Sequence, residues 1–248
     1  MVIPIGDHNP TLRRAWVTWL LVAANIAVFV LFEPVSGTDC QQRAFFLRWA
    51  AIPTELLQGR PLSPRQIAAA TAGACPISVF SGKNVYLSPL YSMFLHGDWL
   101  HLLGNMLYLG IFGNNVEDRF GHLRFLAFYL LSGLVATFVF VGVNGMDLST
   151  LIGASGAIAG VLGAYLVLFP GARVTSLLFI FPIELPALIV LGLWFVLQID
   201  SLRVAPMAGG GVAYLAHVAG FLFGAICTLA YRLANPRRPR PVSRYPYL

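Results

Sequence analysis

Two polar residues interrupt apolar stretches of this chain, and their types could perform serine hydrolysis. Ser155 lies in the stretch Gly153-Ala154-Ser155-Gly156, and His217 is the strongly polar residue of another apolar run more than sixty positions later. Polar side chains are costly in apolar surroundings, so they indicate a functional site there. A serine hydroxyl becomes a nucleophile when a nearby base takes its proton, and neutral imidazole is such a base. The pair therefore predicts a Ser155–His217 dyad.

A third residue often orients the histidine of such a site, but the carboxylates of this chain do not suit that role. Glu184 is expected at one end of its apolar segment, the end that the orientation derived below places on the cytoplasmic side, where it is a membrane-boundary residue. Asp200 is expected in the loop that follows this segment. The sequence therefore favours a dyad over a triad.

Hydrolysis also needs hydrogen-bond donors for the oxyanion that forms on the attacked carbonyl. His101 and Asn105 are four positions apart, so they share one face of a predicted helix. Together with the backbone N–H of Ser155, they could form an oxyanion hole. The alternative is that they form a structural hydrogen-bond pair between helices.

A metal site is the main chemical alternative. His101 and His217, with His96 close by, could bind zinc. However, the sequence has no H-E-x-x-H motif, and no Asp or Glu is expected at the same depth in the apolar segments as these histidines. We therefore expect no metal and no cofactor. His96 is interpreted as a packing residue and His122 as a solvated residue on the cytoplasmic side.

The composition indicates a membrane protein. Apolar residues make up 58% of the 248 residues and charged residues 10%, and the mean hydropathy is +0.75. Soluble domains carry about 25% charged residues, and runs of spanning length disfavour an unusually apolar soluble core. We predict six spanning segments, at about 15–32, 99–113, 122–144, 155–169, 184–199 and 212–233.

The arginines of the short loops predict the orientation. Most lie on one side of the membrane if both termini share that side, so both termini are expected in the cytoplasm. The domain organisation is then a cytoplasmic segment 1–14, a membrane domain 15–233 with an exoplasmic connection 33–95, and a basic, Pro-rich cytoplasmic tail 234–248. The net charge of +6 does not indicate nucleic-acid binding, because five of the sixteen basic residues follow position 231. Such a tail is typical of an anchor beside anionic lipid headgroups.

Two independent arguments predict that Ser155 and His217 meet. Counting 1.5 Å per helical residue places them about 8 and 9 Å below the exoplasmic surface. Small residues at four-residue spacing also allow their helices to approach closely. These residues are Gly156, Gly160 and Ala164 in the fourth segment, and Gly220 and Gly224 after His217 in the sixth.

The long connection holds two of the three cysteines. Cys40 and Cys75 could form a disulfide if that compartment is oxidising, whereas Cys227 is expected to be a small core residue. Residues 44–52 mix Arg and Trp with apolar residues, which fits either a segment in the membrane interface or a packed loop helix.

Three motifs together resemble the rhomboid family of intramembrane serine proteases. They are HGDWLHLLGN at 96–105, GASG at 153–156 and AHVAG at 216–220, on the second, fourth and sixth predicted spans. The resemblance implies an all-α polytopic membrane protein with a six-transmembrane-helix bundle of the bacterial type, in a bacterial inner membrane. It also implies hydrolysis of peptide bonds in or near transmembrane segments of other membrane proteins. The implied roles are Ser155 as nucleophile, His217 as general base, and Asn105 and His101 as oxyanion-hole donors.

Two positions depart from the family pattern. Leu87-Ser88 stand where many members have a Trp-Arg pair, and Ala159 stands where some have an aromatic ring on the catalytic histidine. We therefore expect the loop to be anchored, and the histidine supported, in another way. A catalytically inactive relative that binds transmembrane clients remains the alternative function. A transporter or channel is disfavoured because the polar residues form one cluster rather than a pathway.

Overall fold

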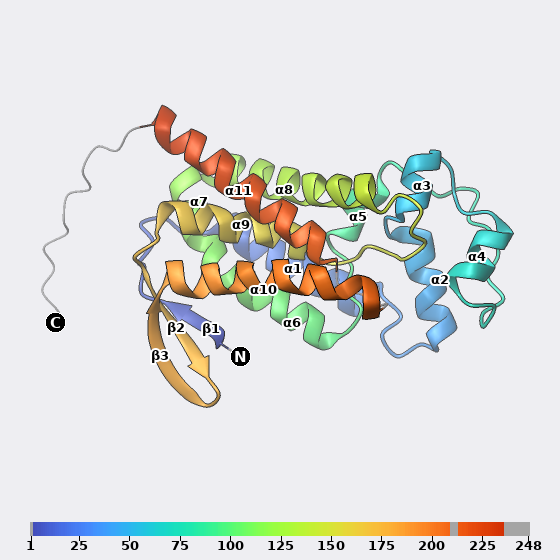
Figure 1. Cartoon of the computed structure of the whole chain (residues 1–248), viewed down its shortest axis with the longest axis horizontal. Helices are drawn as coiled ribbons and strands as arrows, with labels where there is room; N and C mark the ends of the chain where they lie inside the picture. Colours follow the sequence, from blue (N-terminus) through green and yellow to red (C-terminus); the bar gives the residue numbers. More distant parts are fainter. Residues whose placement is uncertain (1, 209–212, 236–248) are drawn as a thin grey trace, which may run out of the picture.

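The computed structural model describes residues 2–208 and 213–235, and its centre is a bundle of long helices (Figure 1). Nearly all of α9 is buried, so this helix forms the middle of the bundle. The bundle consists of α1 (Trp16–Leu31), α6 (Trp99–Tyr108), the π-helical turn η1 (Leu109–Gly113), α7 (Asn114–Phe120), α8 (His122–Val143), α9 (Ser155–Leu168), α10 (Ala187–Ala208) and α11 (Tyr214–Ala234).

The predicted apolar segments correspond to these helices, with differences at two of them. The second segment extends beyond 113, because η1 leads directly into α7. The fifth helix, α10, runs from Ala187 to Ala208, so it includes part of the predicted loop. Within the described residues, α8 and α11 are long and apolar enough to cross a membrane, and α1 and α9 are shorter apolar helices. The count of six spans therefore stays a prediction.

The expectation of an all-α fold is wrong in one respect, because the mostly helical chain also contains a three-stranded antiparallel sheet. Its strands are β1 (Val2–Asp7), β2 (Arg173–Leu178) and β3 (Phe181–Pro186), in the order β1-β2-β3. Asp7 is paired with Val174, and Arg173 with Pro186. The partner of β1 lies more than 160 residues away in the sequence, so no local sequence pattern predicts the pairing.

The sheet also changes the interpretation of Glu184. This residue lies in β3 rather than at the end of a spanning helix, and its Oε2 is 3.1 Å from the Arg173 guanidinium. Asp200 lies on an exposed side of α10, not in a loop.

Asp7 at the end of β1 fixes the sheet to the helices. Its Oδ2 accepts hydrogen bonds from the Tyr165 hydroxyl at 2.6 Å and from Asn115 Nδ2 at 2.9 Å. Burial raises the pKa of Asp7. The N-terminal strand is thereby joined to both α7 and α9.

A second buried acid, Glu117 of α7, caps the start of α1. Its carboxylate accepts the backbone N–H groups of Val17 at 2.9 Å and Thr18 at 2.7 Å, and the Thr18 hydroxyl at 2.6 Å. The first N–H groups of a helix lack acceptors within it, so this contact satisfies donors that would otherwise be unpaired. His122 is exposed, as expected, and its Nδ1 lies 2.5 Å from Glu117 Oε1.

Glycines let α9 and α11 approach to backbone contact, as the small-residue pattern predicts. A Cβ at Gly220 would lie 2.2 Å from the carbonyl oxygen of Gly156, and one at Gly224 would lie 2.0 Å from that of Gly160. A side chain at either position would therefore separate the helices. This approach brings the first turn of α11 beside the first turn of α9.

The connection 33–95 folds into a compact layer at the end of the bundle opposite β1 and the end of α11 (Figure 1). Its helices are α2 (Asp39–Trp49), α3 (Pro53–Gln58), α4 (Pro64–Ala70) and α5 (Ser88–Ser92). They enclose a small core of Leu47, Ile52, Leu62 and Ile67. Residues 44–49 therefore belong to a packed loop helix, and residues 50–52 connect it to α3. The predicted Cys40–Cys75 disulfide is present.

A buried ion pair anchors this layer near the position of the missing Trp-Arg pair. Lys83 Nζ lies 2.5 Å from Glu55 Oε2, and both side chains are almost fully buried. The ammonium also donates to the carbonyl oxygens of Leu47 at 2.8 Å and Ala50 at 2.7 Å. Burial lowers the pKa of Lys83. The end of α2 and the start of α3 are held together by this cluster.

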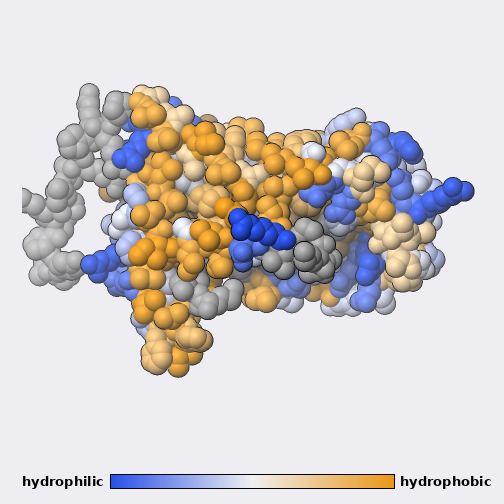
Figure 2. Space-filling view, in the orientation of Figure 1, coloured by the Kyte–Doolittle hydropathy of each residue, from blue (hydrophilic) through white to orange (hydrophobic). Residues whose placement is uncertain are grey.

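The surface of the bundle is apolar in a broad band between two more polar ends (Figure 2). Large exposed apolar side chains supply this band, among them Leu20 of α1, Leu131 of α8, Leu188 and Leu193 of α10, and Leu229 of α11. Extensive exposed apolar surface marks membrane or protein contacts. The features of the chain are those of a membrane protein.

Candidate active site

Ser155 is the first residue of α9, and the preceding loop is fixed from the side of the connecting layer. The backbone N–H of Leu151 donates to the carbonyl of Ala51 at 2.8 Å, and that of Gly153 donates to the carbonyl of Ser92 at 2.9 Å. Gly153 has a φ of 113°, in the region that favours glycine. This turn redirects the chain into α9 and presents the serine at the helix start.

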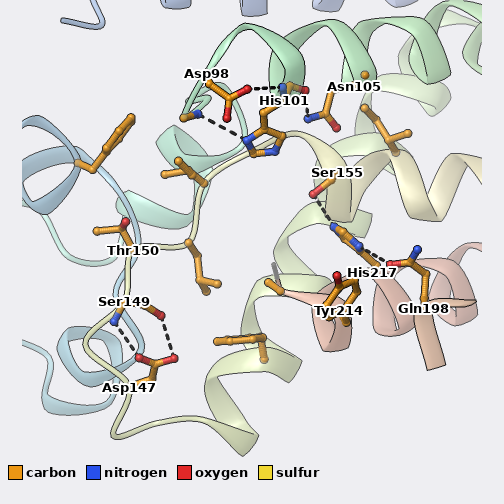
Figure 3. A pocket seen from close by; sticks show the side chains of 18 of the residues that line it. Asp98, His101, Asn105, Asp147, Ser149, Thr150, Ser155, Gln198, Tyr214 and His217 are labelled. Atoms are coloured by element: carbon orange, nitrogen blue, oxygen red, sulfur yellow. Dashed lines mark hydrogen bonds between the residues drawn. The ribbon is translucent and has the colours of Figure 1, made fainter. Parts of the chain in front are cut away.

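His217 lies in the first turn of α11, and its side chain meets Ser155. The distance from His217 Nε2 to Ser155 Oγ is 2.7 Å, which is a good hydrogen bond (Figure 3). The two residues are 62 positions apart in the sequence, and both are partly buried. The structure therefore brings together the two residues that the sequence singles out.

Two aromatic rings flank His217. The Trp194 ring of α10 lies 6.2 Å from the imidazole at an interplanar angle of 33°, and the Tyr214 ring lies 6.3 Å away in an edge arrangement. Ala159 is buried in the core and provides no ring. Support for the histidine therefore comes from α10 and α11 instead of α9.

Gln198 of α10 makes the second polar contact to the imidazole, and the sequence analysis missed it. Its Oε1 lies 2.8 Å from His217 Nδ1 (Figure 3). A glutamine inside the apolar run 184–199 was the available signal, but only carboxylates were considered as partners of the histidine.

His101 and Asn105 of α6 line the same cavity as the dyad. The Asn105 amide donates to the backbone carbonyl of His101 at 2.9 Å, within its own helix rather than between helices. His101 faces the turn before the serine: a Cβ at Gly153 would be 2.7 Å from His101 Nε2 and 3.6 Å from Ser155 Oγ. The absence of a side chain at Gly153 thus leaves room between these two polar atoms.

The cavity has a volume of about 940 Å³ and extends beyond the dyad. It runs from Trp194 and Gln198 past Ser155 to Arg43 and Phe46 of α2. This volume is within the range of small-molecule and cofactor sites. It joins the serine, the histidine and the α6 residues to the polar end of the molecule.

His96 is a fully buried packing residue, as expected. Its ring lies 5.1 Å from that of His101 in an edge arrangement, and burial, with a smaller contribution from His101, lowers the pKa of His96 to about 4. Across residues 2–208 and 213–235, no three His, Cys, Asp or Glu side chains are grouped as metal ligands would be.

Comparison with known proteins identifies the family. The model of the rhomboid domain matches residues 84–233, which is more than half of the chain. The chain therefore belongs to the rhomboid family.

Individual relatives agree with this assignment. RHOMBOID-like protein 5 of Arabidopsis thaliana is 28% identical over 94% of this chain and 76% of its own length. RHOMBOID-like protein 1 of the same plant is 31% identical over 62% of this chain, and Rhomboid protein 1, mitochondrial, of Saccharomyces cerevisiae is 30% identical over 56%. The chain spans 40% of the length of each of the latter two. These eukaryotic relatives do not support the expected bacterial inner membrane.

Proposed function

We propose that this protein is an intramembrane serine endopeptidase that cleaves peptide bonds in or near transmembrane segments of other membrane proteins. The observation that carries the proposal is the 2.7 Å contact between Ser155 Oγ and His217 Nε2 inside a cavity at the end of an apolar bundle. Hydrogen-bonded nucleophile and base are the minimum machinery for acyl transfer.

The first chemical step is attack of Ser155 Oγ on the scissile carbonyl carbon. His217 Nε2 takes the hydroxyl proton as the C–O bond forms, and the carbonyl oxygen becomes an oxyanion. The imidazolium then gives this proton to the leaving amine as the C–N bond breaks. Water, deprotonated by the same histidine, hydrolyses the resulting acyl-enzyme and frees the serine.

Three donors suit the oxyanion. The Ser155 N–H stands at a helix start, where N–H groups have no acceptor within the helix. His101 Nδ1 accepts the Gly97 N–H at 3.5 Å, so its proton belongs on Nε2, the atom that faces the space beside Gly153. The Asn105 amide would add a third donor after leaving the His101 carbonyl. Donors aligned before the reaction stabilise the developing charge strongly.

The substrate class follows from the apolar band around the bundle. A protein whose lateral surface is apolar meets its substrates within the bilayer (Figure 2). We propose six spans with both termini on the cytoplasmic side, and that the cavity supplies water to an otherwise apolar site. Transmembrane proteins are the partners that fit this arrangement.

The test is cleavage of a single-span model substrate by the purified protein in liposomes. Wild-type protein should release two fragments, and Ser155→Ala protein at the same density should release none. Capture of the intact substrate by wild-type protein without cleavage would instead support the alternative, a client-binding protein without catalysis. Cleavage that continues in Ser155→Ala protein would contradict the mechanism.

A further inference from the structure

Gln198 occupies the position from which the imidazole of His217 can be oriented. It lies on α10 one helical turn after Trp194, so both side chains share the face of α10 that contacts the histidine. Figure 3 shows Gln198 beside the His217 ring. Among the described residues, the His217 ring makes hydrogen-bond contacts with Ser155 at Nε2 and with Gln198 at Nδ1.

The role of His217 as a base requires its proton on one particular ring nitrogen. A base for Ser155 must have a free lone pair on Nε2, so the neutral ring must carry its proton on Nδ1. That N–H needs an acceptor, and the Gln198 Oε1 is 2.8 Å away. A hydrogen bond at one ring nitrogen fixes the state of the other.

We propose that Gln198 is a positioning residue for His217: it holds the imidazole in the reactive tautomer and orientation and stabilises the imidazolium formed during catalysis. The inference rests on the proposed function. It converts the expected dyad into a serine–histidine–glutamine arrangement, similar in logic to sites in which an asparagine amide orients a catalytic histidine.

An amide suits this environment better than a carboxylate. A charge in apolar surroundings is costly to desolvate, whereas an amide oxygen accepts the same hydrogen bond without a formal charge. The other polar groups that face His217 are Ser155 of α9, His101 of α6 and Tyr214 of its own helix. None of these three side chains supplies a carboxylate acceptor for Nδ1–H.

The experiment compares Gln198→Leu and Gln198→Glu with the wild type in the liposome assay, over a range of pH. Gln198→Leu keeps the side-chain volume and loses the acceptor. We expect kcat to fall about 10- to 100-fold with KM unchanged, the range found for partners that orient metal-binding histidines. Gln198→Glu restores an acceptor and adds charge, so it should recover activity and move the acid limb of the pH profile to higher pH by about one unit or more. Leu197→Ala, a neighbouring exposed position on α10, is the matched control and should leave both quantities unchanged.

The outcomes separate the inference from the proposed function. Wild-type kcat in Gln198→Leu protein, or a pH profile that does not move in Gln198→Glu protein, would overturn the role of Gln198 while the dyad remained. A fall in thermal stability with an unmoved profile would indicate a purely structural contact and would also overturn it. Absence of Ser155-dependent cleavage in the wild type would overturn the proposed function and this inference together.

Discussion

Gly224 of α11 lies so close to α9 that a Cβ at this position would be 2.0 Å from the carbonyl oxygen of Gly160. The neighbouring atom is backbone and cannot move aside without moving its helix. We therefore expect Gly224→Ala to push α11 away and to lower stability by about 1–3 kcal/mol, the usual cost of overpacking. Cleavage should fall with it, because His217 is on the displaced helix. Thermal unfolding in detergent measures the stability change.

The matched control is Gly142→Ala near the end of α8, where an added Cβ meets nothing within 4 Å. Alanine is the better helix former by about 1 kcal/mol, so this variant should be as stable as the wild type or more so. Equal stability of the two alanine variants would contradict the close packing of α9 and α11.

Gly153→Ala should damage activity more than stability. The residue has a φ of 113°, and a Cβ would lie 2.7 Å from His101 Nε2, in the space beside the serine. Backbone strain of this kind costs about 1–3 kcal/mol. Gly73→Ala is the control, because Gly73 also has a positive φ, of 70°, but has open space around it. If both variants lose the same activity, the effect is strain alone and the space near His101 is not needed.

The buried pair Lys83 and Glu55 should behave as a unit. Lys83→Met removes the cation and leaves the Glu55 carboxylate buried, which typically costs about 3–5 kcal/mol. Adding Glu55→Gln should recover part of this loss, since it removes the uncompensated charge. Unfolding measurements on the two single variants and the double variant give the coupling energy. Additive losses would show that the pair does not anchor the connecting layer.

Glu33 and His96 should give opposite pH dependences of stability. The Glu33 carboxylate accepts the backbone N–H of His96 at 3.0 Å, and burial raises the pKa of Glu33 from 4.5 to about 7. The folded protein therefore holds this proton more tightly, and the contribution of Glu33 to stability is lost as pH rises from about 4.5 to 7. The pKa of His96 falls from 6.5 to about 4, so its contribution is lost as pH falls through that range.

In the wild type, the pH dependences of stability that come from Glu33 and His96 offset each other between about pH 4.5 and 6.5. Glu33→Gln removes the glutamate contribution and leaves that of His96, so the melting temperature of this variant should rise with pH across this window. His96→Asn should leave the glutamate slope, and its melting temperature should fall as pH rises. Parallel curves for the two variants would contradict this assignment.

The sequence predicted the parts of the molecule that depend on local pattern. Apolar runs located the helices, and the glycine spacing before and after His217 indicated the approach of α9 and α11. The sheet could not be predicted, because β1 is short and its partner Arg173–Leu178 is distant in the sequence. Gln198 was missed for a chemical reason: an uncharged amide was not considered where triads usually have a carboxylate. Some family members have an aromatic ring at the position of Ala159. Which side chains take its place beside His217 depends on how α10 packs, and no spacing rule predicts that packing.

The most direct test of the central claim is labelling by a fluorophosphonate probe, with the modified residue located by mass spectrometry. Wild-type protein should be labelled on Ser155, because His217 takes the proton as Oγ attacks phosphorus. His217→Ala should reduce labelling by several orders of magnitude, and Ser155→Ala should abolish it. In the cleavage assay, the double variant should be no worse than either single one, because the two residues act together. Labelling at Ser155 that is unchanged in His217→Ala protein, or labelling of another residue, would contradict the account.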